Sequence, residues 1–397
     1  MMLANILAMS LLLVTGAAAS AAPPHSLDKT TVAEVQARLD GAVQEHGLPG
    51  ATAAIVTGDG RLVSFASGLS DREIGRKMTP DTRMMSGSIG KMFVSAVALS
   101  LVQDGVLDLD APISQWLGQD SDYAKLPNYG AITVRMLLGH NSGLVDHVYM
   151  DSFWTVARER SKDADFAFAP KDLVAFGYGT KPLFKPGEGF HYTDLGYILL
   201  GLVIEKASGE SYYTLLQQRF LYPLALSSTG PSNGRVFNGL AQGYLDASNP
   251  LLGEQGTALS GGVFQINTSS EWTGGGLVTS AGDLAEWAAD LFEGRTRLGT
   301  KYAMEMVAKP GETGKPGRYG LGVYVFDTEF GPLYGHGGWF MGYRSFVGYF
   351  PGCHVSAAIQ MNTERVEQTS VIFRNVFAPA LRASGCASAK DRPSTVN

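Results

Sequence analysis

The stretch that most constrains this chain is Ser88–Gln103, with the sequence SIGKMFVSAVALSLVQ. Its apolar residues occupy nearly all sides of a helical wheel, which predicts a helix buried in a core. Ser88 and Lys91 share one face of its first turn, so the lysine amine can reach the serine hydroxyl. A serine hydroxyl needs an adjacent base to act as a nucleophile, and burial favours the neutral amine that can serve as that base.

The same four-residue spacing occurs a second time, at Ser26–Lys29. Such short patterns arise by chance, so each depends on its context. The second match lies just beyond the expected cleavage site of an N-terminal leader, in a region that we expect to be mobile. Ser88 begins an apolar helix, and the N–H of a residue in a first helical turn is free to donate to a developing oxyanion. We therefore take Ser88 as the candidate nucleophile and Lys91 as its base.

Two later motifs complete a candidate site. Tyr192-Thr193-Asp194 follows the loop Lys185–Gly189, and a tyrosine beside a Ser–Lys pair can pass a proton to a leaving group. The stretch Gly335–Trp339 (GHGGW) predicts a glycine-lined strand that substrate can approach closely, with His336 near the reacting groups. Each motif alone also fits a core tyrosine or a glycine-rich turn with a structural histidine.

Taken together and in this order, the motifs resemble those of the serine β-lactamase and penicillin-binding protein superfamily. The resemblance is strongest to its branch of class C β-lactamases, D-Ala-D-Ala carboxypeptidases, D-aminopeptidases and esterases. It extends over roughly residues 35 to 381. Further segments that match the branch are Met136–Leu144, Lys185–Gly187, Tyr192–Gly201, Gly274–Leu284 and Phe350–Gly352.

The resemblance implies that Ser88 forms an acyl-enzyme that water hydrolyses, with Lys91 as base and Tyr192 as proton relay. His336 takes the place of the lysine in the family's K-T-G strand. The N–H groups of Ser88 and Trp339 would form the oxyanion hole. Residues that would contact the substrate are Asp194, Gly337, Gly338 and Trp339. The resemblance implies neither a metal nor an organic cofactor.

Two departures bear on the substrate. The family's Y-x-N motif has Asp194 at its third position, and an ionised aspartate cannot donate to a substrate carbonyl. Gly337 stands where a Thr or Ser helps to hold a substrate carboxylate. Both changes favour an esterase or a hydrolase of D-residue amides. The alternatives are a D-Ala-D-Ala carboxypeptidase or β-lactamase, and a non-catalytic binding or sensing protein on the same scaffold.

The order of elements predicts an α+β fold. A helix at 31–46, a hairpin at 51–68, strands after Arg318 and a helix near 371–381 suggest one antiparallel sheet built from both ends of the chain. The middle, about 105 to 300, predicts a mainly helical lobe that includes a helix at 195–208 closed by Gly209. Ser280 and Asp283 predict a capping box. We place one hydrolase domain at 31–382 and a polar tail at 383–397.

Residues 1–21 resemble a secretory signal peptide, with an apolar run at 6–14 and the small residues Ala19-Ser20-Ala21. We therefore expect export to the periplasm or medium, without a stable membrane span after cleavage. The net charge of −6, without a basic run, favours a small-molecule or peptide substrate and argues against nucleic acid. Pairing of Cys353 with Cys386 and the oligomeric state stay open.

Two rival sites receive less support. Gly230–Gly234 fits G-x-S-x-G, but a nucleophile elbow needs a strand before Ser232 and a helix after it, and both flanks look like loops. The seven histidines show no H-E-x-x-H pattern, which argues against a metalloenzyme. We expect His140 to support a loop beside the site and His191 to have a packing role.

Overall fold

A nine-stranded antiparallel sheet forms the centre of the molecule, as seen in the computed structural model, which describes residues 26–366 and 368–386. The strands follow the order β3-β2-β1-β14-β13-β12-β11-β10-β9. Their bounds are β1 (Gly50–Val56), β2 (Leu62–Asp71), β3 (Arg76–Lys77), β9 (Gly311–Glu312), β10 (Arg318–Tyr319), β11 (Tyr324–Thr328), β12 (Gly331–Phe340), β13 (Tyr343–Phe350) and β14 (Val355–Met361).

The two ends of the chain meet in this sheet. β1 pairs antiparallel with β14, with Ala51 opposite Met361, and β1 also pairs with β2 as the predicted hairpin. Every residue of β1 and of β14 is buried, because helices cover both faces of the central strands. The predicted α+β plan, with one antiparallel sheet built from both ends, is confirmed.

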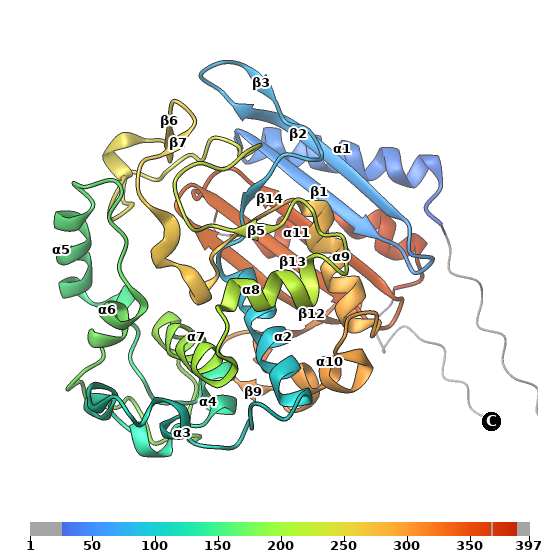
Figure 1. The fold of residues 1–397 in the computed structure, drawn as a ribbon. Helices are drawn as coiled ribbons and strands as arrows, with labels where there is room; N and C mark the ends of the chain where they lie inside the picture. Colours follow the sequence, from blue (N-terminus) through green and yellow to red (C-terminus); the bar gives the residue numbers. More distant parts are fainter. Residues whose placement is uncertain (1–25, 367, 387–397) are drawn as a thin grey trace, which may run out of the picture.

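Helices α1 (Lys29–Glu45) and α11 (Thr369–Ala383) lie together against one face of the sheet (Figure 1). Their apolar side chains, among them Leu39 and Phe373, form one core with the strands. The opposite face packs against α9 (Ala281–Phe292) and the buried helix α2 (Gly90–Gln103), where the rings of Phe93 and Trp287 stack. The sheet is therefore sandwiched, and α2 joins it to the helical lobe.

The middle of the chain forms the predicted helical lobe, drawn in cyan to yellow in Figure 1. Its longest helix, α7, ends at Gly209, whose φ of 75° is the left-handed conformation that favours glycine. The helices of this lobe are α3 (Ser114–Leu117), α4 (Val134–Leu138), α5 (Asp151–Arg160), α6 (Pro170–Ala175), α7 (Asp194–Ser208) and α8 (Tyr212–Leu216). Helix α10 (Gly299–Ala308) follows α9 in the chain.

The predicted capping box at the start of α9 is only half formed. Ser280 accepts from the backbone N–H of Asp283, as expected. The Asp283 carboxylate, however, accepts from the Ser228 N–H and the Thr229 hydroxyl of a neighbouring loop. The predicted bond from the Ser280 N–H to the Asp283 carboxylate is therefore wrong, because Oδ2 binds the neighbouring loop and Oδ1 accepts from the Ser280 hydroxyl instead.

Cys353 and Cys386 form a disulfide across the end of α11, which answers the pairing question. Within the part of the chain that the structure describes, no helix is long and apolar enough to span a membrane. The predicted signal peptide, 1–21, and all but the first four residues of the predicted tail, 383–397, lie outside the described residues.

Candidate active site

The Ser88 turn is built by close backbone packing. Ser88 lies in a short 3-10 turn, η1 (Gly87–Ile89), that leads directly into α2. Gly87 has a φ of 53°, and a Cβ there would come within 2.5 Å of the Trp339 carbonyl oxygen. A Cβ on Gly338 would similarly collide with the Ser86 carbonyl. Both glycines let β12 lie directly against the turn, so the backbones of Ser88 and Trp339 are held together.

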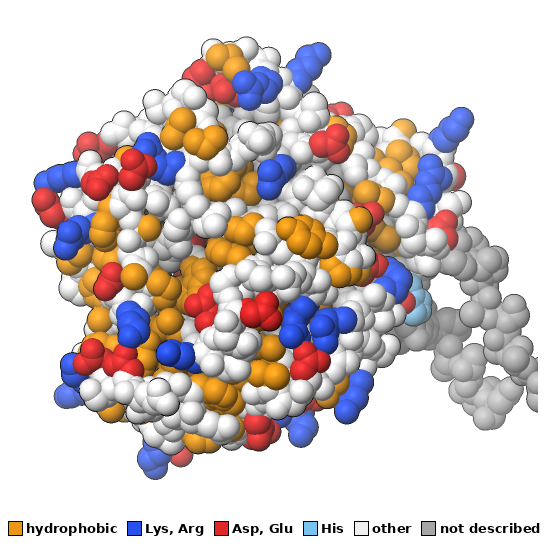
Figure 2. All heavy atoms as spheres, in the orientation of Figure 1, with side chains coloured by type: hydrophobic (Ala, Val, Ile, Leu, Met, Phe, Trp, Pro, Cys, Tyr) orange, Lys and Arg blue, Asp and Glu red, His pale blue; other side chains and the backbone are white. Residues whose placement is uncertain are grey.

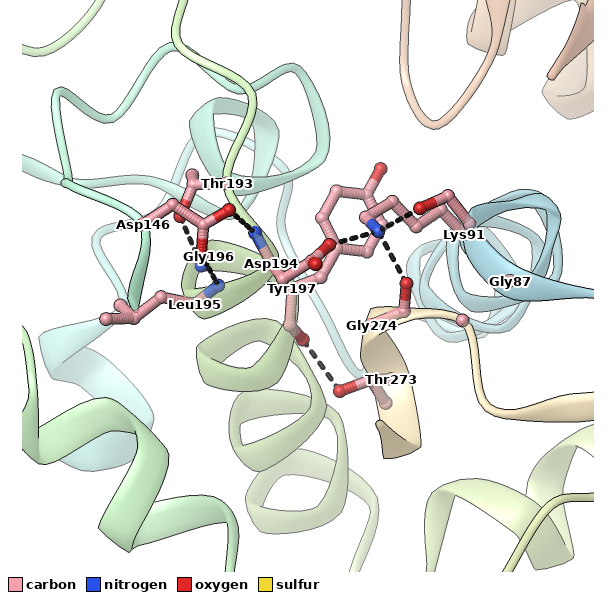
Figure 3. A network of polar contacts seen from close by, with 12 residues as sticks. Gly87, Lys91, Asp146, Thr193, Asp194, Leu195, Gly196, Tyr197, Thr273 and Gly274 are labelled. Carbon is pink, nitrogen blue, oxygen red and sulfur yellow. Dashed lines mark hydrogen bonds and ion pairs between the residues drawn. The ribbon is translucent and has the colours of Figure 1, made fainter. Parts of the chain in front are cut away.

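Lys91 is fully buried and its amine contacts three oxygens. Its Nζ lies 3.1 Å from Ser88 Oγ, 2.5 Å from Asp194 Oδ1 and 2.5 Å from the Gly274 carbonyl oxygen (Figure 3). The amine also lies over the rings of Tyr192 and Tyr197, 4.8 and 5.3 Å from their centroids. These contacts fix the amine beside the serine hydroxyl in the geometry that a base requires.

Asp194 is the first residue of α7, and a second aspartate holds it there. Asp146 Oδ2 accepts from the Asp194 N–H at 2.9 Å, and its Oδ1 accepts from the Leu195 N–H at 3.3 Å. Burial raises the pKa of Asp194, and the Asp146 charge acts in the same direction against the opposing effect of Lys91. Burial alone would raise the pKa of Asp146 too, but His147 and the backbone donors lower it overall.

Tyr192 brings a buried phenol to the same place. Its hydroxyl has no hydrogen-bond partner within the described part of the chain, although Ser88 and Tyr192 line one cavity. Burial, followed by the Asp194 charge, raises the pKa of Tyr192 well above its usual value, and the Ser88 hydroxyl only partly opposes this. The phenol is therefore neutral at neutral pH and has an O–H available for an incoming group.

His336, on β12, lies behind these groups with both ring nitrogens engaged. Nδ1 lies 2.6 Å from the Gly337 carbonyl oxygen, so it donates, and Nε2 lies 3.1 Å from the Tyr319 hydroxyl and accepts from it. Burial lowers the pKa of His336 to about 3, and the Lys91 charge adds to this effect. The imidazole is therefore neutral at working pH, and this geometry favours a positioning role over the proton-transfer role that the sequence suggested.

We expect His336→Gln to leave both limbs of the pH profile of kcat/KM in place, because the imidazole does not titrate there. The loss of rate should stay well below the roughly 10²-fold that a proton-transfer residue contributes. Steady-state kinetics from pH 5 to 10 with a neutral ester checks this. A limb that shifts or disappears in the variant would show that His336 carries a proton after all.

Glu271 is a site residue that the sequence analysis missed. It precedes the 3-10 turn η8 (Trp272–Gly274), whose last residue supplies the carbonyl that contacts Lys91. Its Oε2 is buried without a hydrogen-bond partner in the described chain. Burial raises the pKa of Glu271 to about 8, and the Asp194 charge contributes while Lys91 opposes it. Its only sequence signal is an acidic residue just before the glycine-rich segment 274–276.

A cavity of about 650 Å³ opens at Ser88. Most of its wall is apolar, and the lining includes Phe153, Trp154, Phe168, Leu251, Ile266 and Phe340. The carboxyl groups in its lining are those of Asp146, Asp194 and Glu271, and no lysine or arginine lines it among the described residues. Figure 2 shows one face of the molecule, with hydrophobic side chains near its middle and acidic and basic side chains interspersed around them.

The structure brings together most of the predicted site residues. Ser88, Tyr192, Asp194 and Trp339 line the cavity, and the Lys91 amine lies directly behind Ser88. Gly337 and Gly338 lie on β12 beside them. Ser232, the rival nucleophile, is fully buried and is not part of the cavity lining. Among the described residues, no group of His, Cys, Asp and Glu side chains is placed to hold a metal ion.

A family model described as Beta-lactamase matches residues 35–376. The chain belongs to the beta-lactamase family. The predicted resemblance is thereby confirmed over nearly the whole of the described chain, and the chain is a serine hydrolase of that family.

Curated relatives within this family have several activities. Penicillin-binding protein 4 of Amycolatopsis lactamdurans is 28% identical over 82% of this chain and 84% of its own length. Esterase EstB of Burkholderia gladioli is 32% identical over 52% of this chain and 53% of its own length. The D-aminopeptidase of Brucella ovis is 26% identical over 81% of this chain but only 58% of its own length.

Solved structures agree with the fold. A D-stereospecific amidohydrolase from Streptomyces sp. has a TM-score of 0.74 at 26% identity, covering 87% of this chain and 98% of its own. The D-amino acid amidase of Ochrobactrum anthropi SV3, in complex with D-phenylalanine, has a TM-score of 0.74 at 25% identity, covering 90% and 99%. These relatives thus include a penicillin-binding protein, an esterase, a D-aminopeptidase, a D-stereospecific amidohydrolase and a D-amino acid amidase.

Proposed function

We propose that this protein hydrolyses esters or D-configured amides that carry a bulky apolar group and no carboxylate, through an acyl-enzyme on Ser88. The observation that carries the proposal is the cavity at Ser88, which is apolar in most of its wall and, among the described residues, has no lysine or arginine in its lining. The D-configuration is suggested by the amidohydrolase and amidase relatives.

In this mechanism Ser88 Oγ attacks the substrate carbonyl while its proton passes to the neutral amine of Lys91, 3.1 Å away. The N–H groups of Ser88 and Trp339 would stabilise the oxyanion, since Gly87 and Gly338 hold their backbones together. The buried hydroxyl of Tyr192 then donates its proton to the leaving group and regains one from Lys91. Water hydrolyses the acyl-enzyme by the same steps in reverse.

A substrate carboxylate has no cationic partner in the described cavity wall. It would instead lie near Asp146, whose pKa is lowered by His147 and the backbone donors so that it stays ionised, and like charges brought together cost several kcal/mol. This disfavours β-lactams and D-Ala-D-Ala peptides, both of which carry a carboxylate beside the bond that is cleaved. The departures at Asp194 and Gly337 point in the same direction.

We expect kcat/KM for p-nitrophenyl 4-phenylbutyrate to exceed that for the p-nitrophenyl monoester of glutarate by about 10²-fold. D-phenylalanine p-nitroanilide should be cleaved faster than its L-enantiomer, and capping its amine with a succinyl group should abolish the cleavage. Steady-state kinetics on these matched substrates measures each ratio. Efficient turnover of the glutarate ester or of benzylpenicillin would contradict the proposed substrate class.

We also propose that the protein is exported. The leader-like pattern of residues 1–21 supports this, and so does the Cys353–Cys386 disulfide, because disulfides persist mainly in oxidising compartments. Fractionation of the native producing cells, followed by N-terminal sequencing of the mature protein, would test it. A protein found in the cytoplasm with residues 1–21 intact would contradict export.

A further inference from the structure

The Lys91 amine is surrounded by one acceptor for each proton that an ammonium carries. Ser88 Oγ, Asp194 Oδ1 and the Gly274 carbonyl oxygen all lie within hydrogen-bonding distance of Nζ. An ammonium donates three hydrogen bonds and has no lone pair. In this form it cannot take the Ser88 proton, so one of its own protons must leave first.

Of the three acceptors, only Asp194 can take that proton. The Gly274 oxygen is an amide carbonyl, and Ser88 is the group to be deprotonated. Asp194 lies at 2.5 Å, and it is freed from helix capping because Asp146 accepts from the first N–H groups of α7 in its place (Figure 3). Lys91 is the only partner seen for the Asp194 carboxylate among the described contacts.

The surroundings favour a proton on this carboxylate. Burial and the nearby negative charge of Asp146 both disfavour ionised Asp194, so its pKa is raised despite Lys91. Asp146 itself contacts His147 at 3.2 Å. The titratable groups that face the pair from the surrounding elements are His140, Asp146, His147, Tyr149, Tyr192, Tyr197, Glu271, Tyr324 and His336.

We propose that Asp194 is the proton-holding partner of Lys91, so that Ser88, Lys91 and Asp194 form a relay in which the lysine becomes a base by handing its extra proton to the aspartate. This proposal rests on the proposed function, with Ser88 as nucleophile and Lys91 as base. Asp194 acts through Lys91 and is a positioning residue. It would thus have a role other than that of the amide at the third position of the family's Y-x-N motif.

The relay moves one proton at a time. An Nζ–H bond of the ammonium breaks and an Oδ–H bond forms on Asp194, which leaves a lone pair on Nζ. Rotation about the Cε–Nζ bond turns this lone pair toward Ser88. The Ser88 O–H bond then breaks, an Nζ–H bond forms, and Oγ bonds to the carbonyl carbon as the carbonyl electron pair moves onto oxygen. When the leaving group departs it takes a proton through Tyr192, and Asp194 returns its proton to Lys91.

The acid limb of the pH profile distinguishes a relay from a simple ion pair, because the Lys91–Asp194 pair holds at most two exchangeable protons. In a relay the active enzyme holds one of them, so the acid limb marks the loss of the first. If Asp194 is only a counter-ion, the active enzyme holds neither, and the limb marks the loss of the second. When the two groups are coupled, the first proton leaves the pair at a lower pH than the proton of a lysine beside a neutral amide. The second proton leaves the pair at a higher pH than the proton of that same lysine.

Asp194→Asn therefore gives opposite results for the two models. The relay predicts that the acid limb of kcat/KM moves to higher pH by roughly 1 unit, with a lower rate below it. The profile is measured with p-nitrophenyl 4-phenylbutyrate, and a thermal unfolding curve checks that the variant is folded. A limb that moves to lower pH, or stays in place, overturns the relay. Asp194→Ala removes the same carboxyl group and must give the same sign, should the asparagine variant not fold.

Glu271→Gln is the matched control, since it also converts a carboxyl group near Lys91 into an amide. Glu271 makes no hydrogen bond to Lys91, and its raised pKa keeps it neutral at the pH of the acid limb. The limb should stay in place or move to lower pH in this variant. An upward shift equal to that of Asp194→Asn would overturn the relay, because it would show a general effect of lost charge.

Failure of the inference and failure of the proposed function can be told apart. A fluorophosphonate adduct on Ser88 of the wild-type protein, combined with a downward limb shift in Asp194→Asn, would retain the nucleophile and reject the relay. Absence of any adduct on Ser88 would reject the proposed function and the relay with it.

Discussion

Replacing Ser88 with alanine is expected to lower kcat/KM for an apolar p-nitrophenyl ester by about 10⁴-fold or more, because no other hydroxyl group of the described residues hydrogen-bonds to Lys91. The variant should fold normally, since Ser88 is only partly buried and the change removes a single hydroxyl group. Steady-state kinetics and a thermal unfolding curve measure the two quantities. The residual rate would come from substrate binding and the oxyanion hole alone.

Ser232→Ala is the matched control for this loss. Ser232 is a fully buried serine with no hydrogen-bond partner for its hydroxyl in the described chain, and it lies in the rival G-x-S-x-G motif. Its replacement should leave kcat/KM within about threefold of the wild-type value. The motif assignment would be wrong if Ser232→Ala abolished hydrolysis and Ser88→Ala did not.

Lys91→Met is expected to have the second largest effect on activity and a clear effect on stability. Loss of the base should lower kcat/KM by about 10³-fold to 10⁴-fold. Among the described residues Lys91 is the only cation in contact with Asp194, and its removal should also lower the free energy of unfolding by about 2–3 kcal/mol at pH 8. We expect this loss in the free energy of unfolding to be smaller than the loss on breaking a fully buried ion pair, because the Asp194 side chain keeps 29% of its surface exposed.

A double variant separates these two effects. Adding Asp194→Asn to Lys91→Met removes the unpaired carboxylate, so stability should largely return while activity stays lost. Chemical unfolding at pH 8, run beside the kinetic assay, gives both numbers. An active Lys91→Met enzyme would contradict the role of the lysine. Full stability of the single variant would contradict the importance of the ion pair.

Local sequence patterns predicted the fold well where the residues that determine a helix, strand or turn lie within that element. The apolar run of α2, the turn between β1 and β2, and the glycine after α7 all carry signals within a few residues. The half-formed cap at Ser280 shows the limit of this reasoning. Asp283 has partners on a loop more than fifty residues away, which no helix-capping pattern can reveal.

The residues of the candidate site likewise include some with a local sequence signal and some that only tertiary contacts bring into the site. Motifs predicted Ser88, Lys91, Tyr192 and His336, but not several of the residues that surround them. Three of these contribute through tertiary contacts alone, and they are Asp146, Glu271 and Tyr319. Asp146 lies two residues after the motif-like segment 136–144, so an acid at that place was the one signal that could have been used. The apolar wall likewise gathers side chains from distant segments of the chain.

The most direct test of Ser88 as the nucleophile is to locate a covalent adduct on the protein. Wild-type protein, Ser88→Ala and Ser232→Ala would each be treated with a fluorophosphonate and analysed by intact-mass spectrometry with peptide mapping. We expect one adduct per chain on Ser88 in the wild type and in Ser232→Ala, and none in Ser88→Ala. An adduct that persists in Ser88→Ala, or that maps to Ser232, would contradict the central claim that Ser88 is the nucleophile.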